Sequence, residues 1–97
     1  MSTTAPSSSA ALALPAVLTM GEARQTMAQL ATALPAVASA TIDASTLQTL
    51  DTAAIAVLLQ CRRLAAAAGK PLKITAAPDK LGQLARLYGV EALLGLA

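Results

Sequence analysis

The sequence contains no histidine, and this absence removes most of the catalytic chemistry open to a small domain. Histidine is the commonest general base and the commonest metal ligand, so Ser-His-Asp and Cys-His nucleophiles are excluded. One cysteine and five acidic residues, scattered along the chain, form no cluster with metal-ligand spacing. No glycine-rich phosphate loop is present either. We therefore expect no catalytic residue, no metal site, no cofactor and no small-molecule substrate.

Aromatic and charged residues are also scarce. Tyr88 is the only aromatic residue, and 7 Lys and Arg against 5 Asp and Glu give a net charge of +2. Arg62-Arg63 is the only adjacent basic pair. A chain with neither base-stacking side chains nor a basic stripe is poorly suited to nucleic acid, so we expect no nucleic-acid partner. The lone Cys61 cannot form an intramolecular disulfide, which fits a reducing compartment.

Long apolar runs and export signals are missing as well. No apolar run approaches the ~20 residues that a membrane-spanning helix needs. Residues 10–18 have the length of a signal-peptide core, but no Lys or Arg precedes Arg24 and Pro15 interrupts the run. We expect a cytoplasmic protein without direct membrane insertion.

Alanine and leucine supply most of the hydrophobic residues, which make up 56% of the 97-residue chain. Alanine buries little area, so the core is expected to be thin, which favours a permanent partner. Residues 1–9 are rich in Ser, Thr, Ala and Pro and carry no charge, as in a disordered or variable tail. Residues 10–97 are short enough to form one domain.

Predicted strands alternate with predicted helices, which indicates an α/β fold with parallel neighbouring strands and helices packed on the sheet. Two short β-compatible pieces around Pro15 predict an N-terminal hairpin. A helix is predicted next, from Gly21 to about Leu34, followed by a strand within 36–43 and a loop over 44–49. The central helix is predicted from about Thr52 to Ala68 and is closed by Gly69. After it we expect a strand over 71–75, a helix over 78–88 and a short helical or irregular C-terminal segment.

The residues Asp51 and Thr52 stand directly before the apolar central helix. Both are common N-caps, because their oxygens accept the unpaired amides of the first turn, and a cap needs no further function. The functional interpretation uses the same geometry. A helix N-terminus favours anions, and a phosphate on Thr52 could switch a docking surface on or off. The sequence leaves both interpretations open.

The central helix has apolar residues on two sides. Its inner stripe is Val57, Leu58, Cys61, Leu64, Ala65 and Ala68. The opposite side starts at Thr52 and continues through Ile55 or Ala56, Leu59, and Arg62 or Arg63. On an isolated domain that side should be polar. It is therefore either covered by this chain as core or exposed as a contact face for another protein.

Two further residues have simple structural interpretations. Cys61 lies on the inner stripe and is expected to be a small core residue, not a nucleophile. Tyr88 is expected at the edge of the core with its hydroxyl in water.

The second half of the chain carries its motifs in a characteristic order. A strand ending in Asp is followed by a loop, an Asp-Thr pair with small residues, an apolar helix, a Gly turn, a strand and a Leu-rich helix. These parts are Ile42-Asp43, Asp51-Thr52-Ala53-Ala54, Ile55–Leu64, Gly69, Leu72–Thr75 and Leu81–Tyr88. The order resembles the STAS domain family. The resemblance implies a STAS-like (SpoIIAA-like) α/β fold with a small mixed β-sheet and helices packed mainly on one face.

Two details resemble the MlaB subgroup of this family, namely Asp-Thr in place of Asp-Ser and the final helix "DKLGQLARLYGV". MlaB is the small cytoplasmic STAS subunit of an ABC transport complex that moves phospholipid between the inner and outer membranes. The resemblance implies a non-enzymatic subunit that binds, stabilises and regulates the transporter ATPase, and so lies at the inner membrane and supports outer-membrane lipid asymmetry. The alternative is an anti-sigma-factor antagonist that acts as a phospho-switch at Thr52.

The motif match assigns to Thr52 the family's phosphorylatable or partner-contacting hydroxyl. The expected partner-binding and regulatory residues are Asp51, Thr52, Ala53, Ile55, Ala56, Leu59 and Arg63.

Overall fold

Three parallel strands form the main sheet of the computed structural model, which describes residues 12–37 and 39–96. The strand order is β1 (Leu12–Ala13), β3 (Ala40–Asp43) and β5 (Leu72–Thr75). A separate pair joins β2 (Val17–Leu18) to β4 (Thr49–Leu50). The predicted tail, residues 1–9, lies outside the described residues. Each pairing within the described part is parallel, whereas the expected sheet was mixed.

The predicted N-terminal hairpin is wrong. Strands β1 and β2 do not pair with each other; β1 pairs with β3 and β2 pairs with β4. The side chains of Leu14 and Leu18 are buried, with 2% and 0% exposed. The segment therefore runs on through the core instead of folding back. Part of the predicted loop over 44–49 is also wrong, because Thr49 belongs to β4.

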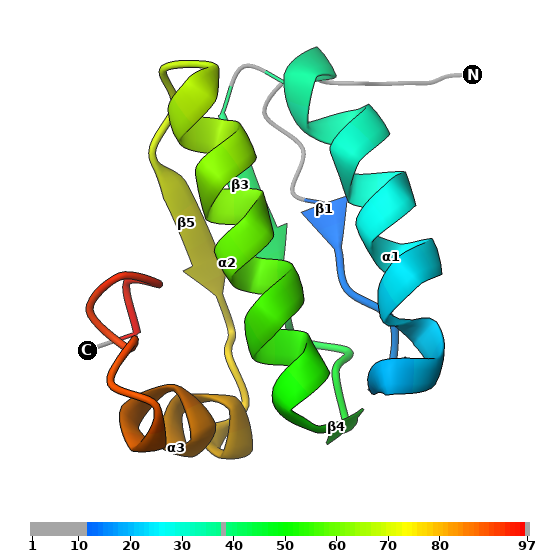
Figure 1. The fold of residues 1–97 in the computed structure, drawn as a ribbon, viewed down its shortest axis with the longest axis vertical. Helices are drawn as coiled ribbons and strands as arrows, with labels where there is room; N and C mark the ends of the chain where they lie inside the picture. The colour runs from blue at the N-terminus through cyan, green and yellow to red at the C-terminus, as the bar shows by residue number, and fades with distance from the viewer. Residues whose placement is uncertain (1–11, 38, 97) are drawn as a thin grey trace.

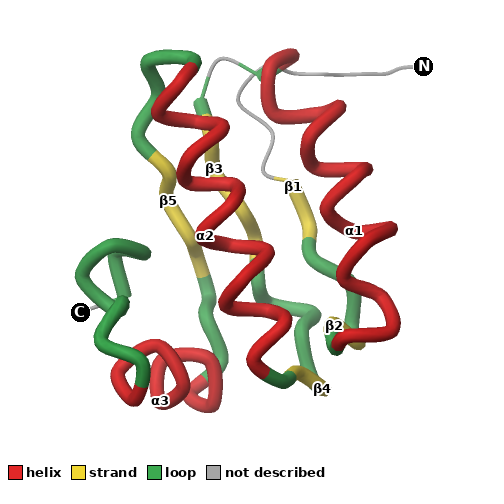
Figure 2. The backbone as a smooth tube through the Cα atoms, viewed as in Figure 1, coloured by secondary structure: helices red, strands yellow, loops and turns green. Residues whose placement is uncertain are grey.

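Two long helices cover one face of the sheet, as the resemblance implied. They are α1 (Met20–Ala33) and α2 (Thr52–Ala67), which lie side by side in front of the strands (Figure 1). A short 3-10 turn, η1 (Leu34–Ala36), extends α1, and Pro35 lies within it. The third helix, α3 (Asp79–Leu87), follows β5 and lies at the end of the molecule where α2 begins (Figure 2).

Backbone chemistry explains where α2 ends. Gly69 has φ +74, a left-handed conformation that favours glycine. The amide of Gly69 donates to Ala66 O at 3.0 Å, and the amide of Lys70 donates to Ala65 O at 2.8 Å. These two bonds form a Schellman motif, so the predicted glycine stop is confirmed.

The core lies between the two long helices and the sheet. Its largest fully buried side chains come from nearly every part of the fold: Leu14, Leu18, Ile42, Leu58, Cys61, Leu81 and Leu94. On β5, the side chain of Lys73 is exposed, while its neighbours Leu72 and Ile74 pack against the core. Because side chains alternate along a strand, Lys73 points to the face of the sheet away from α1 and α2.

Candidate partner-docking site

The carboxylate of Asp51 joins the N-termini of both long helices. Its Oδ1 accepts a hydrogen bond from the Ala53 amide at 2.8 Å, which caps α2. Its Oδ2 accepts from the Met20 amide at 3.3 Å, at the first residue of α1. The sequence allowed either Asp51 or Thr52 to cap α2, and the structure shows that Asp51 is the cap. Thr52 is the first residue of the helix, and its side chain is exposed.

The start of α1 is fixed by a second carboxylate. Glu22 Oε1 accepts hydrogen bonds from the Thr19 amide at 2.8 Å and from Thr19 Oγ1 at 2.6 Å. Both bonds lower the pKa of Glu22, and the bond from the Thr19 side chain has the larger effect. Both helices thus begin at the same end of the molecule with a carboxylate bound to their first turn, a favourable arrangement for the helix dipoles.

A shallow apolar groove runs between α2 and the end of α3. It encloses about 310 Å³ and is lined by Thr52, Ile55, Ala56, Leu59, Tyr88 and Val90. We call it the α2–α3 groove. Four of the expected site residues meet here. The outer side of α2 is partly core and partly exposed surface. Ile55 is buried as part of the core, while Ala56 is exposed and Leu59 is half-buried.

Sequence reasoning missed two residues of this groove. Tyr88 caps the C-terminus of α3 and Val90 follows it. Tyr88 is 53% exposed, more than a residue at the edge of a core would be. The signal available in the sequence was the position of the only aromatic residue, next to Gly89 at a helix end. Nothing in the sequence placed it beside Leu59, because that contact depends on how α3 folds back.

A second apolar groove lies on the other side of the same helix, between α1 and α2. It encloses about 250 Å³ and is lined by Ala23, Arg24, Met27, Ala53, Ala56, Val57 and Gln60. We call it the α1–α2 groove. Among the expected site residues, Ala53 belongs here and Ala56 borders both grooves. Arg63 lines neither groove, but its guanidinium donates to Gln60 Oε1 at 3.2 Å.

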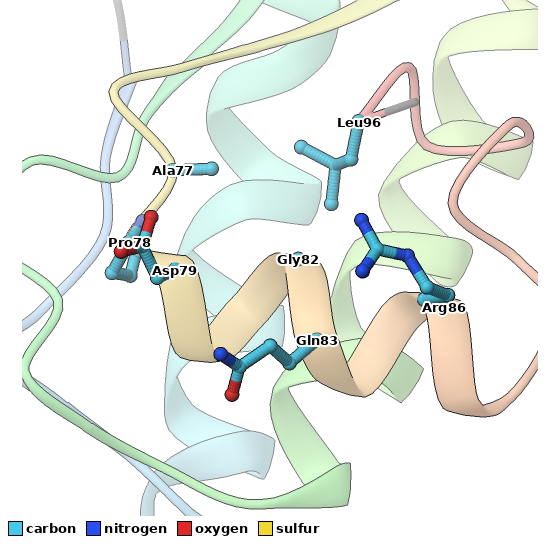
Figure 3. Close-up of a pocket in the computed structure, with 7 residues that line it drawn as sticks. All are labelled: Ala77, Pro78, Asp79, Gly82, Gln83, Arg86 and Leu96. Atoms are coloured by element: carbon cyan, nitrogen blue, oxygen red, sulfur yellow. The ribbon is translucent and has the colours of Figure 1, made fainter.

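Another hollow lies beside α3, and its polar groups do not converge. It encloses about 310 Å³ and is lined by Ala77, Pro78, Asp79, Gly82, Gln83, Arg86 and Leu96. Figure 3 shows Asp79 and Arg86 at opposite ends of α3, with the side chain of Gln83 pointing away from Leu96. Arg86 is paired instead with Glu91 at 3.3 Å. Catalytic and small-ligand sites need polar groups aimed at one point, which this hollow lacks.

Two titratable groups, Cys61 and Asp43, have structural roles. Burial raises the pKa of the Cys61 thiol to about 11, so this cysteine is a core residue and is not activated as a nucleophile. The Ser45 amide donates to Asp43 at 2.9 Å, and hydrogen bonds from Ser45 lower the pKa of that carboxyl. Asp43 is thus the last residue of β3, and its carboxylate stabilises the turn that follows the strand.

The described residues contain neither a cluster of metal-ligating side chains nor a helix suited to span a membrane. Within residues 12–37 and 39–96, no group of three or more His, Cys, Asp or Glu residues lies close enough to hold a metal ion. No helix in this part of the chain combines the length and the apolar character needed to cross a membrane.

A family model described as "Mlab, STAS domain" matches residues 1–95. The chain belongs to the STAS domain family. No curated protein matches it. STAS domains are generally non-catalytic regulatory domains, so membership supports a regulatory, partner-binding role in general terms. The α/β architecture described above is consistent with the STAS fold.

Proposed function

We propose that this STAS domain is a MlaB-like subunit that binds the ATPase of an ABC transporter for phospholipid and so stabilises and regulates it. The observation that carries the proposal is the α2–α3 groove, an apolar surface with the exposed Thr52 at one end. The description of the matching family model, "Mlab, STAS domain", supports the comparison with MlaB and names no partner. In this proposal the protein lies in the cytoplasm and reaches the inner membrane only through the transporter.

The groove has the chemistry of a protein contact. Ile55, Leu59 and Val90 supply apolar walls, while Ala56 leaves room for a partner side chain or helix to approach closely. Tyr88 adds a large aromatic surface with a polar tip, the residue type enriched at protein interfaces. Because Asp51 holds the first turn of α2 in place, the Thr52 hydroxyl is presented in a defined position at low entropic cost.

The test is reconstitution with an ABC transporter ATPase from the same organism. We expect the two proteins to co-purify, and we expect Thr52→Glu and Leu59→Lys each to weaken binding by at least about 30-fold, since a charge would be desolvated in an apolar contact. Lys73→Glu, on the other face of the sheet, is the matched control and should bind like the wild type. Titration by calorimetry measures all four affinities. A wild-type complex that both groove variants leave intact would contradict the proposal.

A second candidate is favoured by one observation. Thr52 is exposed at the start of α2, where a protein kinase could reach it, so an anti-sigma-factor antagonist switched by phosphorylation is the alternative. A phosphate there would gain from the helix dipole but would lie next to the carboxylate of Asp51. Mass spectrometry of the protein isolated from stressed cells tests this candidate. Phosphate found at Thr52 would support it, and unmodified Thr52 under all conditions would eliminate it.

A further inference from the structure

The docking surface extends beyond the α2–α3 groove. The exposed side chains of Thr52 and Ala56 form a ridge, and Ala56 borders an apolar groove on each side. The α1–α2 groove is apolar on both walls, with Ala23 and Met27 on α1 and Val57 on α2. A partner resting on Ala56 would therefore bury both grooves at once, because alanine is too small to hold it away.

Exposed arginines lie toward opposite ends of the α1–α2 groove, because α1 and α2 start at the same end of the molecule and Arg24 is early in α1 while Arg63 is late in α2. Arg24 lines the groove from α1, and Arg63 lies just beyond it on α2, where its guanidinium donates to the groove residue Gln60. Both arginines are exposed. Across the described residues, the single ion pair joins Arg86 of α3 to Glu91 in the segment that follows, so neither Arg24 nor Arg63 is neutralised within that part of the chain.

We infer that the partner surface recognised here straddles Ala56 with apolar side chains in both grooves and carries carboxylates that pair with Arg24 and Arg63. The inference rests on the proposed function for the identity of the partner, and it adds the chemistry by which that partner is selected. An acidic border around an apolar centre would raise the association rate and set the orientation of docking, as complementary charges do at other interfaces.

A second copy of this chain fits the surface less well. The acids at the first turns of α1 and α2 are Glu22 and Asp51, and Oε1 of Glu22 and both oxygens of Asp51 already accept hydrogen bonds there. A second copy that presents the same surface would therefore bring two more arginines and would meet them mainly with carboxylates already engaged in capping.

An anionic membrane also fits less well. The apolar side chains that line the two grooves lie in depressions, whereas membrane binding uses apolar side chains that protrude into the lipid. Depressions on both sides of a small-residue ridge are better filled by protein side chains.

Charge reversal tests the inference with the same ATPase. We expect Arg24→Glu and Arg63→Glu each to weaken binding about 10-fold at low ionic strength, and the difference from wild type to shrink at about 0.5 M salt, where charges are screened. Lys73→Glu makes the same charge change on the opposite face of the sheet and should have no effect. Met27→Gln removes apolar surface without adding charge and should weaken binding at both salt concentrations. Circular dichroism and thermal unfolding check that each variant folds.

The outcomes separate this inference from the proposed function. If the ATPase does not bind the wild-type chain, the proposed function fails. If it binds, and Arg24→Glu and Arg63→Glu bind as tightly as the wild type, only the acidic-partner inference fails. Sedimentation of the chain alone and flotation with vesicles of anionic phospholipid complete the test. A dimer or a vesicle-bound form that the two arginine variants abolish would also overturn the inference, because the occupant would then be a second copy or a membrane.

Discussion

At the scale of single residues, Asp51 and Thr52 are both suited by the sequence to cap α2, but the structure places their side chains differently. Asp51 turns its carboxylate inward to the amides of Ala53 and Met20. Thr52, one position later, is left exposed at the end of the α2–α3 groove. The cap and the proposed contact residue are thus neighbours, and the first holds the backbone of the second in position.

Cys61 provides a test at the same scale. The thiolate is the reactive form of cysteine, and with a pKa of about 11 the native protein holds little thiolate near neutral pH. We expect a thiol reagent at about pH 8 to modify the native protein only as fast as the chain opens, and the denatured protein within seconds. With an aromatic disulfide as the reagent, the absorbance of the thiolate that it releases measures the rate of the reaction. Rapid modification of the native protein would show that Cys61 is accessible.

At the scale of elements, α1 and α2 are linked at both ends. Asp51 connects their N-termini. At the other end the Lys70 side chain, just past the Schellman turn of α2, donates to Leu34 O at 3.2 Å and also to Val37 O, where η1 ends. These links hold the two helices in register, so the α1–α2 groove between them has a defined width.

Removing the first link should loosen the pair. Asp51→Ala loses both hydrogen bonds and the charge at the helix N-terminus, so we expect the free energy of unfolding to fall by about 1–2 kcal/mol. Asp51→Asn keeps an oxygen that can accept from the Ala53 amide and should lose less. Urea unfolding followed by circular dichroism measures both. Equal stability of the alanine variant and the wild type would show that this link contributes nothing.

At the scale of the whole molecule, the last residues of the chain close the core. Leu94 is 1% exposed although it lies in a turn segment beyond α3. The neighbouring Leu93 is 49% exposed. A core built mainly of alanine and leucine depends on each large side chain that it holds.

This contrast predicts the effect of two matched substitutions. Leu94→Ala should lower the free energy of unfolding by about 2–5 kcal/mol, because it leaves a cavity in the core. Leu93→Ala removes the same atoms from an exposed position and should change stability by less than about 0.5 kcal/mol. Thermal and urea unfolding of the two variants provide the comparison. Similar losses for both would mean that the C-terminal segment is not packed as described.

Much of the local structure was predictable. The three helices, the buried strand β3 and the Gly69 stop follow from spacing and from caps that act within a few residues. The hairpin prediction was wrong because β1 and β2 are two residues long, too short to specify a partner, and their pairing is decided by β3 and β4. The candidate site was half predictable. Ile55, Ala56 and Leu59 share a face of one helix, but Tyr88 and Val90 reach them only through the packing of α3.

The sequence by itself determined the class of the protein and the start and end of its helices. The lack of histidine, the Asp-Thr pair and the order of motifs are properties of residue type and short spacing, which need no fold to be recognised. Only the tertiary structure decided which strands pair, that Ile55 is buried while Ala56 is exposed, and that two grooves meet on one ridge. These features depend on contacts between segments far apart in the chain, and packing of the whole core, not local propensity, selects such contacts.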